Sequence, residues 1–75
     1  MKNPSPGEKV VLIKLPPGLI DNLPAEDQKA ISEVVGKPVL LNAYDEDGRA
    51  ELEWWDYRED VGHFIYVDPT FIKAW

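Results

Sequence analysis

Residues 39–55 constrain the fold of this chain more than any other segment. Residues 39–44 and 49–55 are rich in strand-forming side chains, and they flank the turn-forming cluster at 45–48. This pattern predicts a β-hairpin that closes through a three-residue turn with a bulge. Gly48 suits such a turn because it can adopt a positive φ without a Cβ clash. The segment predicts a fold class, but it does not name a chemistry.

The length of 75 residues predicts one domain with one small core. A chain of this size buries only about 60% of the surface that its unfolded form exposes. We expect residues 1–6, with two prolines and no apolar anchor, to be a flexible lead, and residues 7–75 to form the domain.

The chain has no cysteine for disulfides or thiolate metal sites. The apolar runs fall short of the roughly 20 residues of a membrane span, and residues 1–7 lack a signal-peptide core, so we expect a cytoplasmic protein without a membrane partner.

The charge is concentrated in residues 45–60. This segment holds eight acids and two arginines, and its net charge of −6 equals that of the whole chain. Such a segment repels phosphates, so we expect no nucleic-acid partner and instead a protein partner with a basic or cationic surface. The alternative interpretation is a solvated acidic hairpin that keeps the protein soluble and its strand edges unpaired.

The remaining segments predict one helix and three further strands. Residues 10–13 form a short apolar strand, which Pro16, Pro17 and Gly18 end. A helix should begin at Pro24 and stop before Gly36, with an apolar stripe that packs on the sheet. After a charged turn at 57–62 we expect a strand at 63–67, one tight helical turn at 68–70 and a final strand at 71–75.

The expected core takes side chains from every strand and from the helix. Ile31 and Val35 should pack from the helix. Eight strand residues should be largely buried: Val11, Ile13, Leu41, Leu52, Trp54, Ile65, Val67 and Ile72.

This order of elements resembles the SH3-like small barrel. The resemblance rests on residues 8–13 as a first strand, the turn at 45–48 and the segment 67–72 with its one-turn helix before a last strand; it spans roughly four fifths of the chain. It implies a mostly β fold, a five-stranded small barrel with one short helix inserted in the long loop after the first strand. Residues 15–36 replace the acidic long loop and the Tyr motif of peptide-binding SH3 domains, so binding of proline-rich peptides is not implied. The small barrel serves many unrelated functions.

The sequence offers little for catalysis. Ser5, Ser32 and Thr70 lie in no nucleophile motif, and His63 is the only histidine. The acidic turn at 45–48 lacks the twelve-residue ligand spacing of a calcium loop. We therefore expect no enzyme, no cofactor and no metal site.

Strand alternation separates the two adjacent tryptophans. Trp54 should face the core with Ala50 and Leu52, whereas Trp55 should share the opposite face with Glu51 and Glu53. An accessible indole beside two carboxylates suits a Lys- or Arg-bearing partner, and Tyr57 and Tyr66 would extend the patch. The alternative is that Trp55 lies under the long loop, covered by the apolar residues Leu19, Ile20 or Leu23.

We therefore expect a small, non-catalytic protein-binding or accessory module that docks through this acidic, aromatic face of the hairpin. The first alternative is a small enzyme, or a subunit whose site near His63 forms with a partner. The second is nucleic-acid binding on a KOW-like barrel, which the scattered lysines disfavour. Trp75 is either a last core residue or the contact of a weak homodimer.

Overall fold

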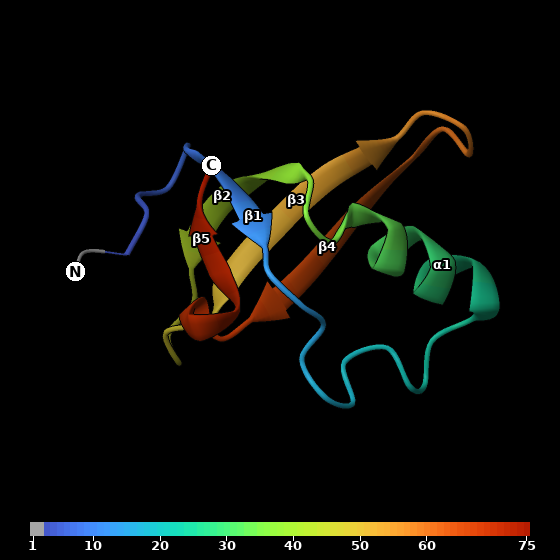
Figure 1. Cartoon of the computed structure of the whole chain (residues 1–75), viewed down its shortest axis with the longest axis horizontal. Helices are drawn as coiled ribbons and strands as arrows, with labels where there is room; N and C mark the ends of the chain where they lie inside the picture. Colours follow the sequence, from blue (N-terminus) through green and yellow to red (C-terminus); the bar gives the residue numbers. More distant parts are fainter. Residues whose placement is uncertain (1–2) are drawn as a thin grey trace.

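The computed structural model describes residues 3–75, and Met1 and Lys2 of the predicted lead lie outside them. The chain is mostly β, with one α-helix and one 3₁₀ helix (Figure 1). In chain order the elements are β1 (Lys9–Leu12), α1 (Ala25–Val34), β2 (Pro38–Tyr44), β3 (Ala50–Asp56), β4 (Val61–Val67), η1 (Pro69–Phe71) and β5 (Ile72–Ala74).

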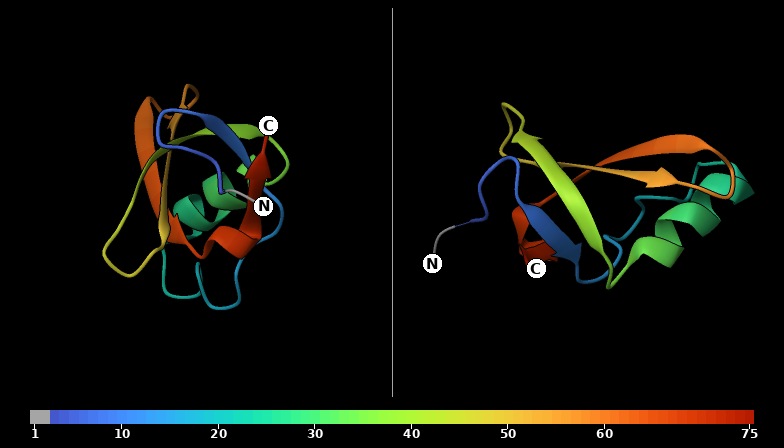
Figure 2. Two further views of the ribbon diagram at one scale, coloured as in Figure 1. Left: turned by 90° about the vertical axis from the view of Figure 1, so that its left-hand side faces the viewer. Right: turned by 90° about the horizontal axis from the view of Figure 1, so that it is seen from above.

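All five strands are antiparallel and form one sheet in the order β4-β3-β2-β1-β5. The predicted mostly β class, the number of strands and the helix after the first strand are confirmed. Viewed along its long axis the sheet curls strongly (Figure 2). Within residues 3–75, however, its two edge strands, β4 and β5, do not pair with each other, so the sheet is not a closed barrel.

The turn between β2 and β3 has the predicted geometry. Gly48 has φ of +81°, and its N–H donates to the Asp45 carbonyl over 2.9 Å. The Asp45 N–H in turn donates to the Arg49 carbonyl over 2.9 Å, which closes the three-residue loop. The Asp45 side chain caps the turn by accepting from the backbone N–H groups of Asp47 and Arg49.

Strand β2 contains an irregularity that the sequence did not predict. Leu41 lies opposite Leu52, whereas Ala43 lies opposite Glu51, so Asn42 is an extra residue in β2. The β2–β3 ladder also stops at the pair Leu40 and Glu53. Beyond that pair, the start of β2 pairs only with β1 and the end of β3 only with β4, so the two strands diverge.

The core lies on the inner face of the curled sheet. Its fully buried side chains include Val10, Leu12, Val39, Leu41, Ala50 and Leu52. Most of the predicted core is buried, but the expectation for Ile13 is wrong, because this side chain is 48% exposed. Alternation explains the error: Val10 and Leu12 point inward, so the predicted residues Val11 and Ile13 are on the other face of β1. Val11 is still buried there, at 7% exposure, whereas Ile13 lies past the end of the strand. Trp54 is only half-buried, and it packs against the edge of the core.

Helix α1 lies at the end of the molecule opposite β5 (Figure 1). Pro24 is its N-cap rather than its first residue, and Gly36 follows its C-terminus with φ of +85°, a conformation in which glycine is favoured. Ile31 and Val34 bury the apolar stripe, while Val35 is half-buried against the same core. Within residues 3–75, no helix is both long enough and apolar enough to cross a membrane.

Candidate protein-binding face

The outer surface of β3 and β4 gathers aromatic rings and carboxylates. Glu51, Glu53 and Trp55 point outward from β3, as alternation predicts. The ladder places Tyr66 opposite Glu51 and Phe64 opposite Glu53. These five residues, Glu51, Glu53, Trp55, Phe64 and Tyr66, define the aromatic–acidic face. Its three aromatic residues, Trp55, Phe64 and Tyr66, are 48%, 57% and 44% exposed.

Trp55 presents one side of its ring to solvent. Gly62 lies opposite it on β4, and a Cβ on Gly62 would lie 3.4 Å from Cε3 of the indole. The indole therefore rests against β4 at the one position without a side chain. Leu19 and Ile20 of the long loop pack against the core instead of covering Trp55.

Asn42 holds the two glutamates of the face together. Its side-chain amide donates to Oε1 of Glu53 over 2.8 Å and to Oε1 of Glu51 over 3.2 Å. Glu51 and Glu53 are both half-buried residues, and within residues 3–75 neither forms an ion pair with a Lys, Arg or His. Two like charges thus share one neutral donor, beside exposed aromatic rings.

Tyr66 occupies the other end of the face. Its hydroxyl donates to Oε2 of Glu51 over 3.3 Å, and the guanidinium of Arg49 lies 5.4 Å from the centre of its ring. The pKa of Tyr66 is raised, chiefly because the negative charge of the nearby Glu51 carboxylate disfavours formation of the phenolate. The phenol therefore stays protonated and remains a donor at neutral pH.

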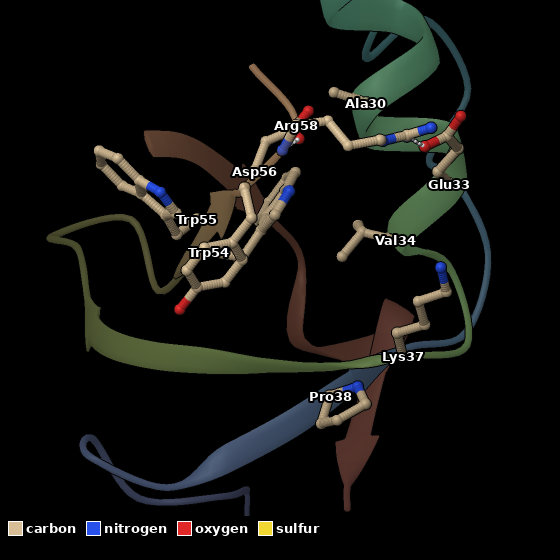
Figure 3. Close-up of a pocket in the computed structure, with 10 residues that line it drawn as sticks. Ala30, Glu33, Val34, Lys37, Pro38, Trp54, Trp55, Asp56 and Arg58 are labelled. Atoms are coloured by element: carbon tan, nitrogen blue, oxygen red, sulfur yellow. Dashed lines mark hydrogen bonds and ion pairs between the residues drawn. The ribbon is translucent and has the colours of Figure 1, made fainter. Parts of the chain in front are cut away.

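Two clefts open where β2 and β3 diverge. One, of about 340 Å³, lies between α1 and the end of β3 (Figure 3). Trp54 points into it, Trp55 points away, and an ion pair between Arg58 and Glu33 bridges its walls. The other, of about 390 Å³, includes Glu53 and Trp55 in its lining. Tyr57 lines both clefts from the turn after β3 and is 87% exposed.

His63 is placed away from solvent. Its ring stacks on Trp54 with centroids 5.4 Å apart, and its side chain is 12% exposed. Nε2 is buried without a hydrogen bond and lies 4.0 Å from Oδ2 of Asp56. Asp56 uses its other oxygen to accept from the backbone N–H groups of Arg58 and Glu59, which shapes the β3–β4 turn.

The acidic turn at 45–48 is organised by Arg49. Nε of Arg49 donates to Oδ2 of Asp45 over 2.8 Å, and Asp47 lies 3.8 Å from the same guanidinium. Burial opposes the charge on Asp45, but the hydrogen bonds from the Arg49 backbone and guanidinium outweigh it and lower the pKa of Asp45. Among residues 3–75, no three acidic or histidine side chains are grouped so as to hold a metal ion.

The structure brings four of the five predicted partner-binding residues onto one face: Glu51, Glu53, Trp55 and Tyr66. Tyr57 lies beside this face, at the clefts. Sequence reasoning missed Phe64 and Asn42. Alternation from Tyr66 would have identified Phe64, but nothing in the sequence indicates that Asn42 bridges both glutamates, because that contact depends on the irregularity in β2.

Comparisons with protein-family models, with curated proteins and with solved structures find no match to this chain.

Proposed function

We propose that this protein is a non-catalytic protein-binding module that docks a basic or cationic partner on the aromatic–acidic face. One observation carries the proposal: Glu51 and Glu53 share a neutral amide among exposed rings, with no cation paired to either within residues 3–75. A cation from a partner would neutralise the negative charge of Glu51 and Glu53.

The energetics favour binding at this place. The acidic side chains of half-buried residues are screened by water less than those of fully exposed residues, so a cation interacts with them more strongly. Exposed aromatic rings supply contact area at a small entropic cost, and Trp and Tyr are over-represented among the residues that dominate binding energy. Trp55 and Tyr66 bracket the glutamate pair, so a partner that neutralises the pair also covers rings.

Charge argues against a nucleic-acid partner. The segment 45–60, which includes all of β3, carries the whole net charge of −6. The same charge steers cationic proteins toward this side of the molecule and makes their association sensitive to salt.

We further propose that the fold is an open form of the SH3-like small barrel. Three features support this: the strand order β4-β3-β2-β1-β5, the long helix-bearing loop after β1, and the 3₁₀ helix η1 directly before β5. The fold does not select the function, which rests on the aromatic–acidic face alone.

Two titrations at low salt test the proposed function. One adds a short peptide of alternating glycine and basic residues, and the other adds duplex DNA, each followed by tryptophan fluorescence. We expect the peptide to bind, with an affinity that falls as salt rises, and the DNA not to bind. DNA binding that weakens steeply with salt, or no peptide binding at all, would overturn the proposal.

A further inference from the structure

Two pairs of an aromatic ring and a carboxylate on the β2–β3–β4 surface can be compared. One pair is Tyr66 with Asp45, and the other is Trp55 with Glu53. Within residues 3–75, only the first pair is completed by a cation of the chain. Comparing the two pairs indicates which chemistry completes the second.

Arg49 completes the first pair. Its guanidinium lies 5.4 Å from the centre of the Tyr66 ring, and its Nε donates to Oδ2 of Asp45 over 2.8 Å. One side chain thus combines a cation–π contact with a charge-assisted hydrogen bond. These contacts form at the protein surface, since Tyr66 is 44% exposed.

The second pair has the same two components, but in the part of the chain that the structure describes no cation is paired with its carboxylate. Trp55 and Glu53 are two residues apart on the outer face of β3, roughly 7 Å along the strand. One side of the indole packs against Gly62, while 48% of the residue remains exposed. Oε1 of Glu53 accepts from Asn42, which fixes the carboxylate in place.

The space beside this pair admits a side chain. Glu53 and Trp55 both line the cleft of about 390 Å³ between β2 and β3, together with Leu40, Tyr57 and Lys9. Lys9 lies across Leu40 from Glu53 and, within residues 3–75, forms no ion pair with it. The walls of the cleft are otherwise apolar or aromatic near the carboxylate.

We propose that Trp55 and Glu53 bind an arginine side chain of a partner protein, stacked on the exposed indole and hydrogen-bonded to the carboxylate. This inference rests on the proposed function and specifies its partner. Arginine fits better than lysine because a planar guanidinium can stack on a ring and fork onto a carboxylate at once, and it is more weakly hydrated than an ammonium group.

The test compares two peptides that differ only in the cation. They are the blocked peptide Gly-Arg-Gly-Arg-Gly and its lysine counterpart, titrated into ¹⁵N-labelled full-length protein at low salt. The indole N–H signals of Trp54, Trp55 and Trp75 report the site. We expect the arginine peptide to bind about tenfold more tightly, the difference of one charge-assisted hydrogen bond, and to shift the Trp55 signal most.

Two matched variants test whether the peptide arginine binds at Glu53. Glu53→Gln should remove most of the preference for arginine, whereas Glu26→Gln, which removes the same charge from an exposed position on α1, should not. Equal affinity of both peptides, or an arginine preference that survives Glu53→Gln, would overturn this inference and leave the proposed function standing. If neither peptide binds, the proposed function fails as well.

Discussion

At the scale of the residue, Trp54 and Trp55 are neighbours in sequence with different surroundings. Trp54 stacks on His63 on the inner side of the sheet, while Trp55 rests on Gly62 on the outer side. Strand alternation alone predicts this division. It does not predict that Trp54 is only half-buried, because that depends on the divergence of β2 from β3, which opens a cleft beside it.

Ile13 shows where residue-level prediction stops. The apolar run at 10–13 has no polar residue to mark the outward positions, so the sequence does not reveal which of its members point inward. Asn42 presents the opposite case, a polar residue whose role appears only once the irregularity in β2 brings its amide to both glutamates.

Asn42 should stabilise the protein by donating hydrogen bonds to two neighbouring carboxylates. We expect Asn42→Ala to lower the free energy of unfolding by about 1–3 kcal/mol at pH 7, because two carboxylates lose their shared donor. Urea unfolding measures the loss. In a Glu51→Gln background, where one charge is gone, the same substitution should cost less. An equal loss in both backgrounds would show that Asn42 acts through the strand irregularity rather than through the carboxylates.

At the scale of the element, the turn and capping residues predicted most of the boundaries between helices and strands. Gly48 at the turn, Pro24 and Gly36 around the helix, and Asp68 with Pro69 before the last strand each mark a boundary close to the observed one. These signals are local, so they can be recognised without tertiary context. The β2–β3 hairpin is local too, and the sequence predicted it. The pairing of β2 with β1 is not local, and the sequence did not predict that it occupies the end of β2 where the β2–β3 ladder stops.

The β2–β3 turn should make stability depend on pH through Asp45. Its pKa is lowered in the folded protein from an unfolded value near 3.8, so its stabilisation is present at neutral pH and is lost as pH falls below about 4. Asp45→Asn should therefore be less stable than the parent protein at pH 7, and the difference should shrink toward pH 2.5. Thermal melts across this range provide the measurement.

Glu46→Gln is the matched control for the turn. Glu46 is exposed in the same turn, and its substitution by Gln removes one negative charge, as Asp45→Asn does. We expect it to melt close to the parent protein at both ends of the pH range. If Glu46→Gln and Asp45→Asn behave alike, the effect reflects the overall charge of the turn and not the contacts between Asp45 and Arg49.

At the scale of the whole molecule, a small core leaves little stability in reserve. A single core of this size supplies about 3–5 kcal/mol. Leu52 is fully buried at the centre of β3, and truncation of such a side chain to alanine costs about 2–5 kcal/mol. Leu52→Ala should therefore be substantially unfolded at room temperature in urea titrations. Ile13→Ala, at a site 48% exposed, should shift the midpoint much less. Similar midpoints for the two variants would contradict the inward register of β3.

The account also implies that the binding face and the core are separate parts of the molecule. The core lies on the inner face of the sheet, and the aromatic–acidic face lies on the outer side of β3 and β4. The sequence predicted this separation through alternation in residues 50–55. It did not predict the clefts beside the face. These open because the start of β2 pairs with β1 and no longer with β3.

The affinity of Trp55→Ala for a basic peptide, measured by calorimetry beside its melting temperature, tests the central claim most directly. We expect affinity to fall by at least about 30-fold, roughly 2 kcal/mol, while the melting temperature stays close to that of the parent protein. Trp75→Ala is the control, because Trp75 is 76% exposed and follows β5, which β2 and β1 separate from β3; it should bind normally. A folded Trp55→Ala variant with unchanged affinity, or one that unfolds, would contradict the account.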